Sequence, residues 1–220
     1  MKTQVVGLGA GGHAKVVIEI LRFSDSFELI GLLDPKETLW GTDVLGVPVL
    51  GGDHLLPDVY KRGVRGVFVG VGATGEVWPR RRLYRMARAQ GFEPVTAIHP
   101  TAVVSTSARI GCGGTVMAGA IVNAAARLGE NVIVNSGAIV EHDCVIGDHA
   151  HIAPGAMLAS AVHVGEGSHV GLGAAVLQGR RIGCNVVIGA GAVVVRDVQD
   201  DVVVTGVPAR VLKARSDEHE

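Results

Sequence analysis

The chain has 220 residues, a formal net charge of −1 at pH 7 and a sequence pI near 6.8. This balance gives no electrostatic case for nucleic acid or a membrane surface as a partner, and no apolar run approaches the roughly 18 residues that span a bilayer. Its three cysteines lack metal-type spacing and no signal peptide precedes the first strand pattern, so we expect reduced thiols and a cytoplasmic protein.

Residues 1–100 show the alternation of strands and helices that is typical of a compact α/β domain. An apolar run at 4–8 predicts the first strand, and residues 14–22 have the apolar spacing of a helix. The same patterns predict strands at 27–33, 66–72 and 93–98, a helix at 77–90 and a short edge segment at 47–50. Because the strands alternate with helices, we expect a Rossmann-like domain with a parallel sheet.

A glycine-rich turn separates the first strand from the first helix. Gly7, Gly9 and Gly12 match the spacing of a dinucleotide-binding fingerprint, and Asp34 follows about twenty residues later. A full dinucleotide fold needs a second mononucleotide half, and only about 65 residues remain before a repeat begins, which is too few. We therefore expect the turn and the helix N-terminus to hold a phosphate where strand ends converge. A turn that binds nothing is the alternative.

The rest of the chain has a period of six residues. Every sixth position is aliphatic through sixteen consecutive steps: Val104, Ile110, Val116, Val122, Leu128, Val134, Val140, Ile146, Ile152, Leu158, Val164, Val170, Val176, Ile182, Ile188 and Val194. The residue four places after each of these is mostly small. Six is the period of neither a helix nor an ordinary strand, so it predicts a solenoid with one aliphatic side chain inside each flat face and a small residue at each corner. We place this domain at 101–213 and expect a disordered polar tail at 214–220.

Aliphatic-glycine pairs within this period, such as Ile146-Gly147 and Ile182-Gly183, resemble the hexapeptide-repeat acyltransferases. The resemblance implies a left-handed parallel β-helix with three hexads in each coil, so that sixteen hexads make about five coils. The sequence Gly-Ala-Gly-Gly-His at 9–13 and the triplet Glu-His-Asp at 141–143 narrow the resemblance to sugar acetyltransferases of the bacillosamine-pathway, GDP-perosamine and sialic acid types. These are acetyl-CoA-dependent enzymes, and the resemblance implies a homotrimer with active sites between subunits.

The resemblance also assigns binding residues. The nucleotide of a nucleotide-linked amino sugar would contact Gly11, Gly12, His13, Asp34, Gly70 and Gly72. Acetyl-CoA would lie along the groove between adjacent β-helices, contacting His151, Leu172 and Ala190. Ser160 stands one predicted coil after His142, so its backbone N–H can face the developing oxyanion.

The nucleotide base is less clearly indicated. Gly11 and Pro35 stand where the bacillosamine type tends to have a serine and a second acid. A guanosine nucleotide is therefore as admissible as a uridine nucleotide, and the sequence does not decide between GDP, UDP and dTDP.

The resemblance makes His142, in the Glu-His-Asp triplet, the candidate general base. An imidazole with a pKa near 6.5 suits the removal of a proton from an attacking amine at neutral pH. A carboxylate that accepts a hydrogen bond from the ring fixes its tautomer and raises its basicity. The resemblance assigns this role to Asp143, whereas spacing alone admits Glu141 equally.

The solenoid histidines raise the alternative of a zinc site. Five of them lie in the repeat: His142, His149, His151, His163 and His169. Zinc needs three or four ligands that converge on one point, and only His151 and His169 stand one predicted coil apart. We therefore expect no metal.

The resemblance, together with these residues, predicts an N-acetyltransferase that moves acetyl from acetyl-CoA directly onto the amine of a nucleotide-linked 4-amino-4,6-dideoxysugar. An O-acetyltransferase that acts on sialic acid or another sugar with the same base is the alternative. A non-catalytic or metal-dependent β-helix protein is the rival from another class. Neither nucleic acid nor membrane insertion is expected.

Overall fold

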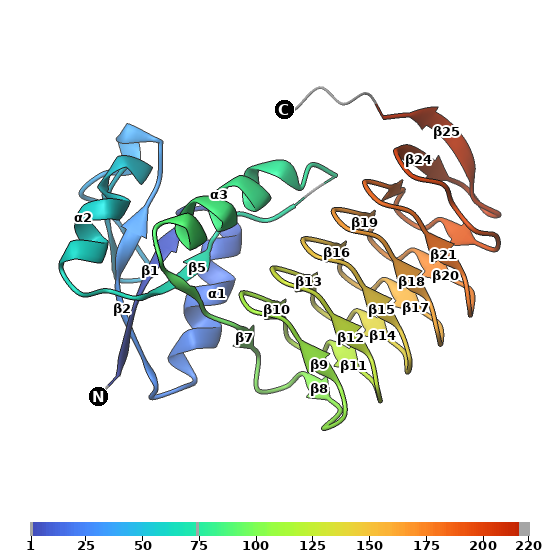
Figure 1. The fold of residues 1–220 in the computed structure, drawn as a ribbon, viewed down its shortest axis with the longest axis horizontal. Coiled ribbons are helices and arrows are strands. Elements are labelled where there is room, and N and C mark those ends of the chain that lie inside the picture. Colours follow the sequence, from blue (N-terminus) through green and yellow to red (C-terminus); the bar gives the residue numbers. More distant parts are fainter. Residues whose placement is uncertain (1, 74, 216–220) are drawn as a thin grey trace.

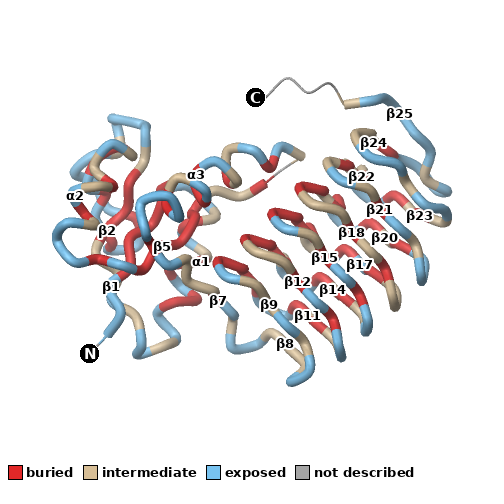
Figure 2. The backbone as a smooth tube through the Cα atoms, in the orientation of Figure 1, coloured by how far each residue is buried: buried red, intermediate tan, exposed pale blue. Residues whose placement is uncertain are grey.

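The computed structural model describes residues 2–73 and 75–215, which form two domains side by side (Figure 1). An α/β domain comes first in the chain, and a long stack of coils follows it. Buried residues concentrate in the central strands of the first domain and recur in every coil of the second (Figure 2). The predicted fold, an α/β domain followed by a left-handed parallel β-helix, is confirmed.

The α/β domain is built on a six-stranded sheet with the order β3-β4-β2-β1-β5-β6. Its strands are β1 (Thr3–Leu8), β2 (Phe27–Leu33), β3 (Asp43–Val44), β4 (Val47–Gly51), β5 (Gly66–Val69) and β6 (Glu93–Pro94). Its helices are α1 (Gly12–Arg22), α2 (Leu56–Lys61) and α3 (Trp78–Ala89), with short 3-10 helices η1 (Glu37–Leu39) and η2 (Asp53–Leu55). The strands pair in parallel except β3, which runs antiparallel to β4.

The alternation of side chains along β1 sorts the core into two layers. Val5 belongs to a buried cluster that also contains residues of α1 and Ile133 of the second domain, whereas Val6 belongs to a cluster with residues of α2 and α3. Successive strand residues point to opposite faces of a sheet. Helix α1 therefore covers the face next to the β-helix, and α2 and α3 cover the other face.

Three sheets form the sides of the β-helix. The first contains β7 (Ala97–Ile98), β10 (Thr115–Val116), β13 (Ile133–Val134), β16 (His151–Ile152), β19 (His169–Val170), β22 (Val187–Ile188), β24 (Val202–Thr205) and β25 (Arg210–Ala214). The second contains β8 (Val103–Val104), β11 (Ile121–Val122), β14 (Ile139–Val140), β17 (Met157–Leu158), β20 (Ala175–Val176) and β23 (Val193–Val194). The third contains β9 (Arg109–Ile110), β12 (Arg127–Leu128), β15 (Val145–Ile146), β18 (His163–Val164) and β21 (Arg181–Ile182). The strands of these sheets pair in parallel except β25, which runs antiparallel to β24.

The predicted hexads account for the inside of the coils. Aliphatic residues such as Val134 and Ile152 are fully buried, and so are small corner residues such as Ala138. One feature of the period was not predicted. The third residue after most inward positions has a positive φ. These residues are Gly113, Gly119, Ala125, Asn131, Gly137, Asp143, His149, Gly155, Ala161, Gly167, Gly173, Gly179, Asn185 and Gly191. Glycine, which adopts this left-handed conformation without a steric cost, occupies most of them.

Two predicted boundaries differ from the structure. The strand predicted at 93–98 is divided, because β6 pairs with β5 in the α/β sheet whereas β7 pairs with β10 in the β-helix. The predicted tail begins too early, because β25 extends to Ala214 and Arg215 donates a hydrogen bond to the carbonyl oxygen of Asn185. Residues 216–220 of that predicted tail lie outside the described residues. The β24–β25 hairpin pairs with β22 and forms the C-terminal end of the first sheet.

Candidate functional site

The glycine-rich turn lies between the carboxyl end of β1 and the N-terminus of α1. Gly9 has a φ of +102°, and a side chain there would run into Val71. By contrast, open space surrounds Gly11, which precedes α1, and Gly12, its first residue. The first N–H groups of a helix lack partners within the helix. The turn therefore offers backbone donors to an anion, which suits the predicted phosphate contact.

Asp34 follows β2 and is bound to this turn. Its Oδ2 accepts a hydrogen bond from the backbone N–H of Ala10 at 2.8 Å, and its Oδ1 accepts one from the N–H of Lys36 at 2.9 Å. A carboxylate has about four acceptor positions. The two that remain suit a ribose hydroxyl or a base N–H, so Asp34 combines a structural role with the predicted nucleotide contact.

The loop after β5 carries Gly70 and Gly72 and packs against the start of α1. A Cβ at Gly70 would lie 2.6 Å from the carbonyl oxygen of Gly9, so only glycine fits there, whereas a Cβ at Gly72 would lie 3.9 Å from Nδ1 of His13. Burial, followed by the nearby Arg80 and His151, holds the pKa of His13 well below its usual value. All six residues predicted to bind the nucleotide therefore border one edge of the sheet, with a neutral imidazole among them.

His151 lies in the interface between the domains. Its side chain is only 4% exposed, Nδ1 donates to the carbonyl oxygen of Ala73 and Nε2 accepts from the Asn135 amide at 3.0 Å. The ring of His169, one coil later, meets it edge-on with centroids 4.9 Å apart. Burial, with help from His169, lowers the pKa of His151 to about 4. Its imidazole is thus engaged by groups of its own chain, and its predicted acetyl-CoA contact stays a prediction.

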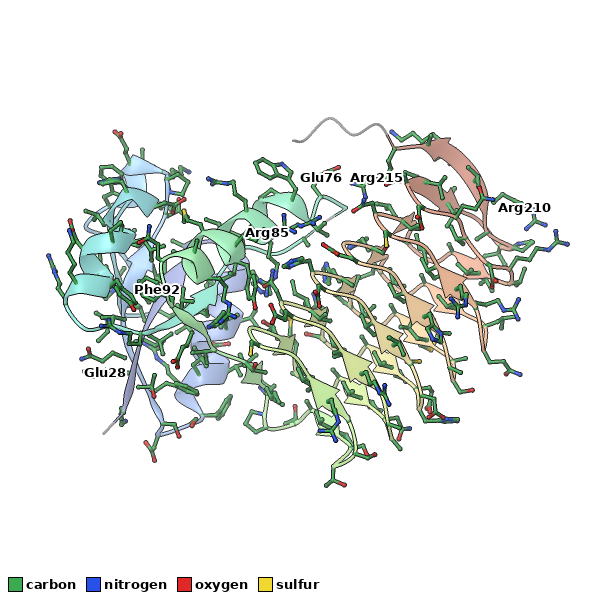
Figure 3. The ribbon with its side chains drawn as sticks, in the orientation of Figure 1. Glu28, Glu76, Arg85, Phe92, Arg210 and Arg215 are labelled. Atoms are coloured by element: carbon green, nitrogen blue, oxygen red, sulfur yellow. The ribbon has the colours of Figure 1, made fainter. Side chains whose placement is uncertain are left out.

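The α/β domain is attached along one corner of the β-helix, between the third and first sheets. On α3, Tyr84 donates to Oε2 of Glu130 at 2.7 Å, and Arg81 forms an ion pair with Glu166 at 2.7 Å. At the far end of the loop that precedes α3, Glu76 faces Arg215 of the C-terminal segment at 3.4 Å (Figure 3). These contacts hold the predicted nucleotide-binding edge of the α/β sheet over the first sheet of the β-helix. We call this edge the nucleotide edge, and its residues are Gly11, Gly12, His13, Asp34, Gly70 and Gly72.

His142 lies at a corner between the second and third sheets, with its side chain 55% exposed. Its Nδ1 is 2.7 Å from Oδ2 of Asp143, whose backbone has a φ of +60°. Glu141 is engaged elsewhere, because its Oε2 accepts from the Asn123 amide at 3.0 Å and from the backbone N–H of His142 at 3.2 Å. The geometry therefore pairs the imidazole with Asp143, the partner that the resemblance had assigned.

The other predicted residues of the β-helix occupy two different corners. Ser160 lies one coil beyond His142, where the N–H of Ala161 donates to the His142 carbonyl oxygen at 2.9 Å. Leu172, which is 58% exposed, and Ala190 lie at corners between the first and second sheets. The second sheet separates these corners from His142. One chain therefore does not bring His142 and the predicted acetyl-CoA residues together.

The nucleotide edge is also separated from His142 within one chain. In a three-sided coil, the corner between the second and third sheets is the one opposite the first sheet. The α/β domain packs on that first sheet, through the buried cluster that Ile133 shares with α1 and the hydrogen bond between His151 and Ala73. The predicted nucleotide-binding residues and His142 thus lie on opposite sides of the β-helix.

Within the described ranges 2–73 and 75–215, no three His, Cys, Asp or Glu residues are placed to hold a metal ion. In the same ranges, no helix is long and apolar enough to cross a membrane.

Comparisons with known proteins cover both domains. The model of the PglD N-terminal domain matches residues 4–87, and the model of the bacterial transferase hexapeptide (six repeats) matches residues 125–160. A search of curated protein sequences returned no match.

Solved structures match nearly the whole chain. PerB from Caulobacter crescentus, in complex with CoA and GDP-perosamine, has 44% sequence identity and a TM-score of 0.88, over 96% of this chain and 97% of that chain. The acetyltransferase domain of PglB from Neisseria gonorrhoeae has 39% identity and a TM-score of 0.87, over 96% and 100%. WeeI from Acinetobacter baumannii has 27% identity and a TM-score of 0.81, over 96% and 100%.

Proposed function

The chain belongs to the hexapeptide-repeat transferases that carry a PglD-type N-terminal domain, and from this premise we propose that it is an acetyl-CoA-dependent N-acetyltransferase. Its acceptor is the amine of a nucleotide-linked 4-amino-4,6-dideoxysugar. The likeness to PerB, which was solved with CoA and GDP-perosamine, extends over both domains and supports this choice. The observation that carries the chemistry is the exposed His142 imidazole, 2.7 Å from Asp143.

His142 is the general base in this proposal. Because Nδ1 donates to Asp143, Nε2 is left as the basic nitrogen. The sugar amine attacks the thioester carbonyl, and Nε2 takes the proton from the nitrogen as it becomes cationic. Collapse of the tetrahedral intermediate then breaks the carbon–sulfur bond, and the leaving CoA thiolate takes the proton from the imidazolium. No covalent acetyl-enzyme forms.

The corner around Ser160 stabilises the intermediate. The N–H groups of its neighbours Ala159 and Ala161 donate to carbonyl oxygens of the Val176 and His142 residues. The Ser160 N–H lies between them, one coil from the base. A backbone donor in this place supports the oxyanion, a contribution that is often worth several kcal/mol in acyl transfer.

The active site is completed by a second subunit, and we propose a homotrimer. The outward residues of the second sheet are all apolar: Val103, Ile121, Ile139, Met157, Ala175 and Val193. Val103 is 63% exposed and Met157 is 47% exposed in the single chain, so this row suits burial against neighbouring copies. A cyclic arrangement brings the His142 corner of one subunit beside the first-to-second-sheet corner of the next. The nucleotide edge, the predicted acetyl-CoA residues and the base then meet.

An assay of CoA release across acceptors tests the proposed function. GDP-, UDP- and dTDP-linked 4-amino sugars are compared with their 4-hydroxy counterparts and with sialic acid. We expect an amino sugar to be acetylated, and GDP-linked sugars are tried first because PerB was solved with one. Faster acetylation of sialic acid than of every amino sugar would make the enzyme an O-acetyltransferase. Absence of both turnover and CoA binding would instead favour a non-catalytic β-helix protein.

A further inference from the structure

Arg80, in the first turn of α3, is a fully buried cation at the junction of the two domains. Its side chain is 1% exposed, and burial lowers its pKa to about 9. Five groups surround the guanidinium, and all of them are neutral: four carbonyl oxygens and one imidazole nitrogen. Burial of a charge is costly unless its donors are satisfied. The role of Arg80 therefore lies in what these five contacts hold in place.

One guanidinium nitrogen serves the nucleotide edge. Nη1 donates to the carbonyl oxygens of Val69 at 2.8 Å and Val71 at 2.9 Å, which flank Gly70. The same nitrogen lies 3.3 Å from Nε2 of His13. A single group thus fixes the loop after β5 and the first turn of α1.

The other two nitrogens face the β-helix. Nη2 donates to the carbonyl oxygen of Gly113 and Nε to that of Asn131, each at 3.4 Å. Gly113 and Asn131 are equivalent left-handed corner residues of successive coils, with φ values of +71° and +57°. Arg80 therefore ties the nucleotide edge to two coils through a rigid, planar group.

The contact between Arg80 and His13 determines which ring nitrogen of His13 carries the hydrogen. An arginine side chain only donates hydrogen bonds, and Nη1 shares its two hydrogens among the oxygens of Val69 and Val71 and this ring. A hydrogen on Nε2 of His13 would point at these donors, so the contact favours Nε2 as an acceptor. The low pKa of His13 keeps the ring neutral, and its one hydrogen is then on Nδ1. That nitrogen is 3.9 Å from where a Cβ of Gly72 would lie, on the side of the predicted nucleotide contacts.

We propose that Arg80 is a positioning residue that holds His13 as its neutral Nδ1–H tautomer and fixes the 70–72 loop against the β-helix. His13 then presents an N–H donor to an oxygen of the nucleotide-linked sugar, either a diphosphate oxygen or a hydroxyl. The Arg80 guanidinium makes no contact with the ligand in this proposal, because its nitrogens already face carbonyl oxygens and His13. The ligand rests on the proposed function, whereas the tautomer does not depend on it.

The first test separates nucleotide binding from acetyl-CoA binding. Arg80→Gln should raise the KM for the nucleotide sugar about tenfold, the effect of losing a buried hydrogen bond to a charged group. The KM for acetyl-CoA and kcat should stay within about twofold of wild type. The KM for the nucleotide sugar in Arg80→Lys should lie between those of wild type and Arg80→Gln, since a lysine keeps the charge without the planar fork.

Arg81→Gln is the matched control, because it removes a contact between α3 and the β-helix that does not touch the nucleotide edge. Equal effects on both KM values, or no effect beyond that of Arg81→Gln, would overturn the proposal.

The second test needs no substrate and no altered Arg80. Nitrogen-15 NMR of histidine-labelled wild-type protein, with His13 assigned by the signal lost in His13→Gln, distinguishes protonated from unprotonated ring nitrogens. We expect a protonated Nδ1 and an unprotonated Nε2 at pH 7. A hydrogen on Nε2, or a doubly protonated ring, would overturn the proposal even if Arg80→Gln fails to fold. If the protein shows the expected tautomer but binds no nucleotide sugar, the proposed function is wrong and the role of Arg80 in setting the tautomer still holds.

Discussion

Acidification should destabilise the junction between the domains, because the buried His151 ring resists protonation in the folded protein. Its pKa is about 4 in the folded protein against 6.5 for an unperturbed imidazole, because the ring is buried and lies near His169 and Arg80. The stabilisation from the neutral buried ring is complete above pH 6.5. It is lost as the pH falls towards 4, because only the unfolded chain binds the proton in that window.

The difference between the two pKa values corresponds to about 3 kcal/mol. The pKa values of His13 and His169 are lowered too, chiefly by burial, and act in the same direction. The assay is urea unfolding at pH 7.5 and pH 4.5 at a fixed protein concentration, since assembly contributes to apparent stability. His151→Gln should lose about 2 kcal/mol less between these pH values than the wild type does.

A matched control is His54→Gln, which alters an exposed histidine away from the junction. It should keep the wild-type loss of stability on acidification. If wild type and His151→Gln instead lose stability in parallel, the argument that burial keeps His151 neutral is wrong.

Three further predictions concern the proposed site. His142→Ala should lower kcat by roughly 10²–10⁴ in steady-state assays with little change in acetyl-CoA affinity, and Asp143→Asn should cost less because the base remains; an acetyl-enzyme trapped with acetyl-CoA alone would contradict this mechanism. Gly11→Leu, in open space and without backbone strain, should raise the KM for the nucleotide sugar but leave that for acetyl-CoA nearly unchanged; if both rise together, the two ligands do not bind to separate domains. Met157→Glu should dissociate the trimer in sedimentation experiments by placing a charge in the apolar row; an active wild-type monomer would refute the intersubunit site.

The β-helix could be predicted from the sequence because each hexad repeats one local solution. An aliphatic residue such as Ile152 is buried inside and a small one such as Ala138 fills a corner, so the same spacing returns in every coil. The left-handed corner position was missed because its occupants differ chemically. Most are glycine, but Asp143 and His149 also take this conformation. The signal for it is the recurrence of Gly, Asn and Asp at the same period.

The α/β domain was predicted less completely. The two-residue strand β3 and the six-residue helix α2 are too short for a periodic signal to stand out. The strand predicted at 93–98 looked continuous because both halves are strands, and only tertiary pairing assigns them to different sheets.

The contacts at the junction could not be predicted from local patterns. Arg80 is one of three consecutive arginines, and the sequence does not show that Arg80 is buried whereas Arg82 is exposed. One side of helix α3 is buried, and the rotation of the helix about its own axis relative to the β-helix decides which arginine points inward. The enclosure of His151 by Ala73 likewise depends on how the two domains dock.

Subunit mixing tests most directly the central claim, that a nucleotide edge on one subunit works with His142 on the next. Gly11→Trp, which fills the nucleotide edge, and His142→Ala are each expected to be nearly inactive alone. They are mixed in equal amounts, dissociated and reassembled. If each site uses two subunits, about a quarter of the sites in random trimers combine two intact halves, and about a quarter of wild-type activity returns. Activity that stays at the level of the separate variants, in trimers shown to be mixed, would contradict the account.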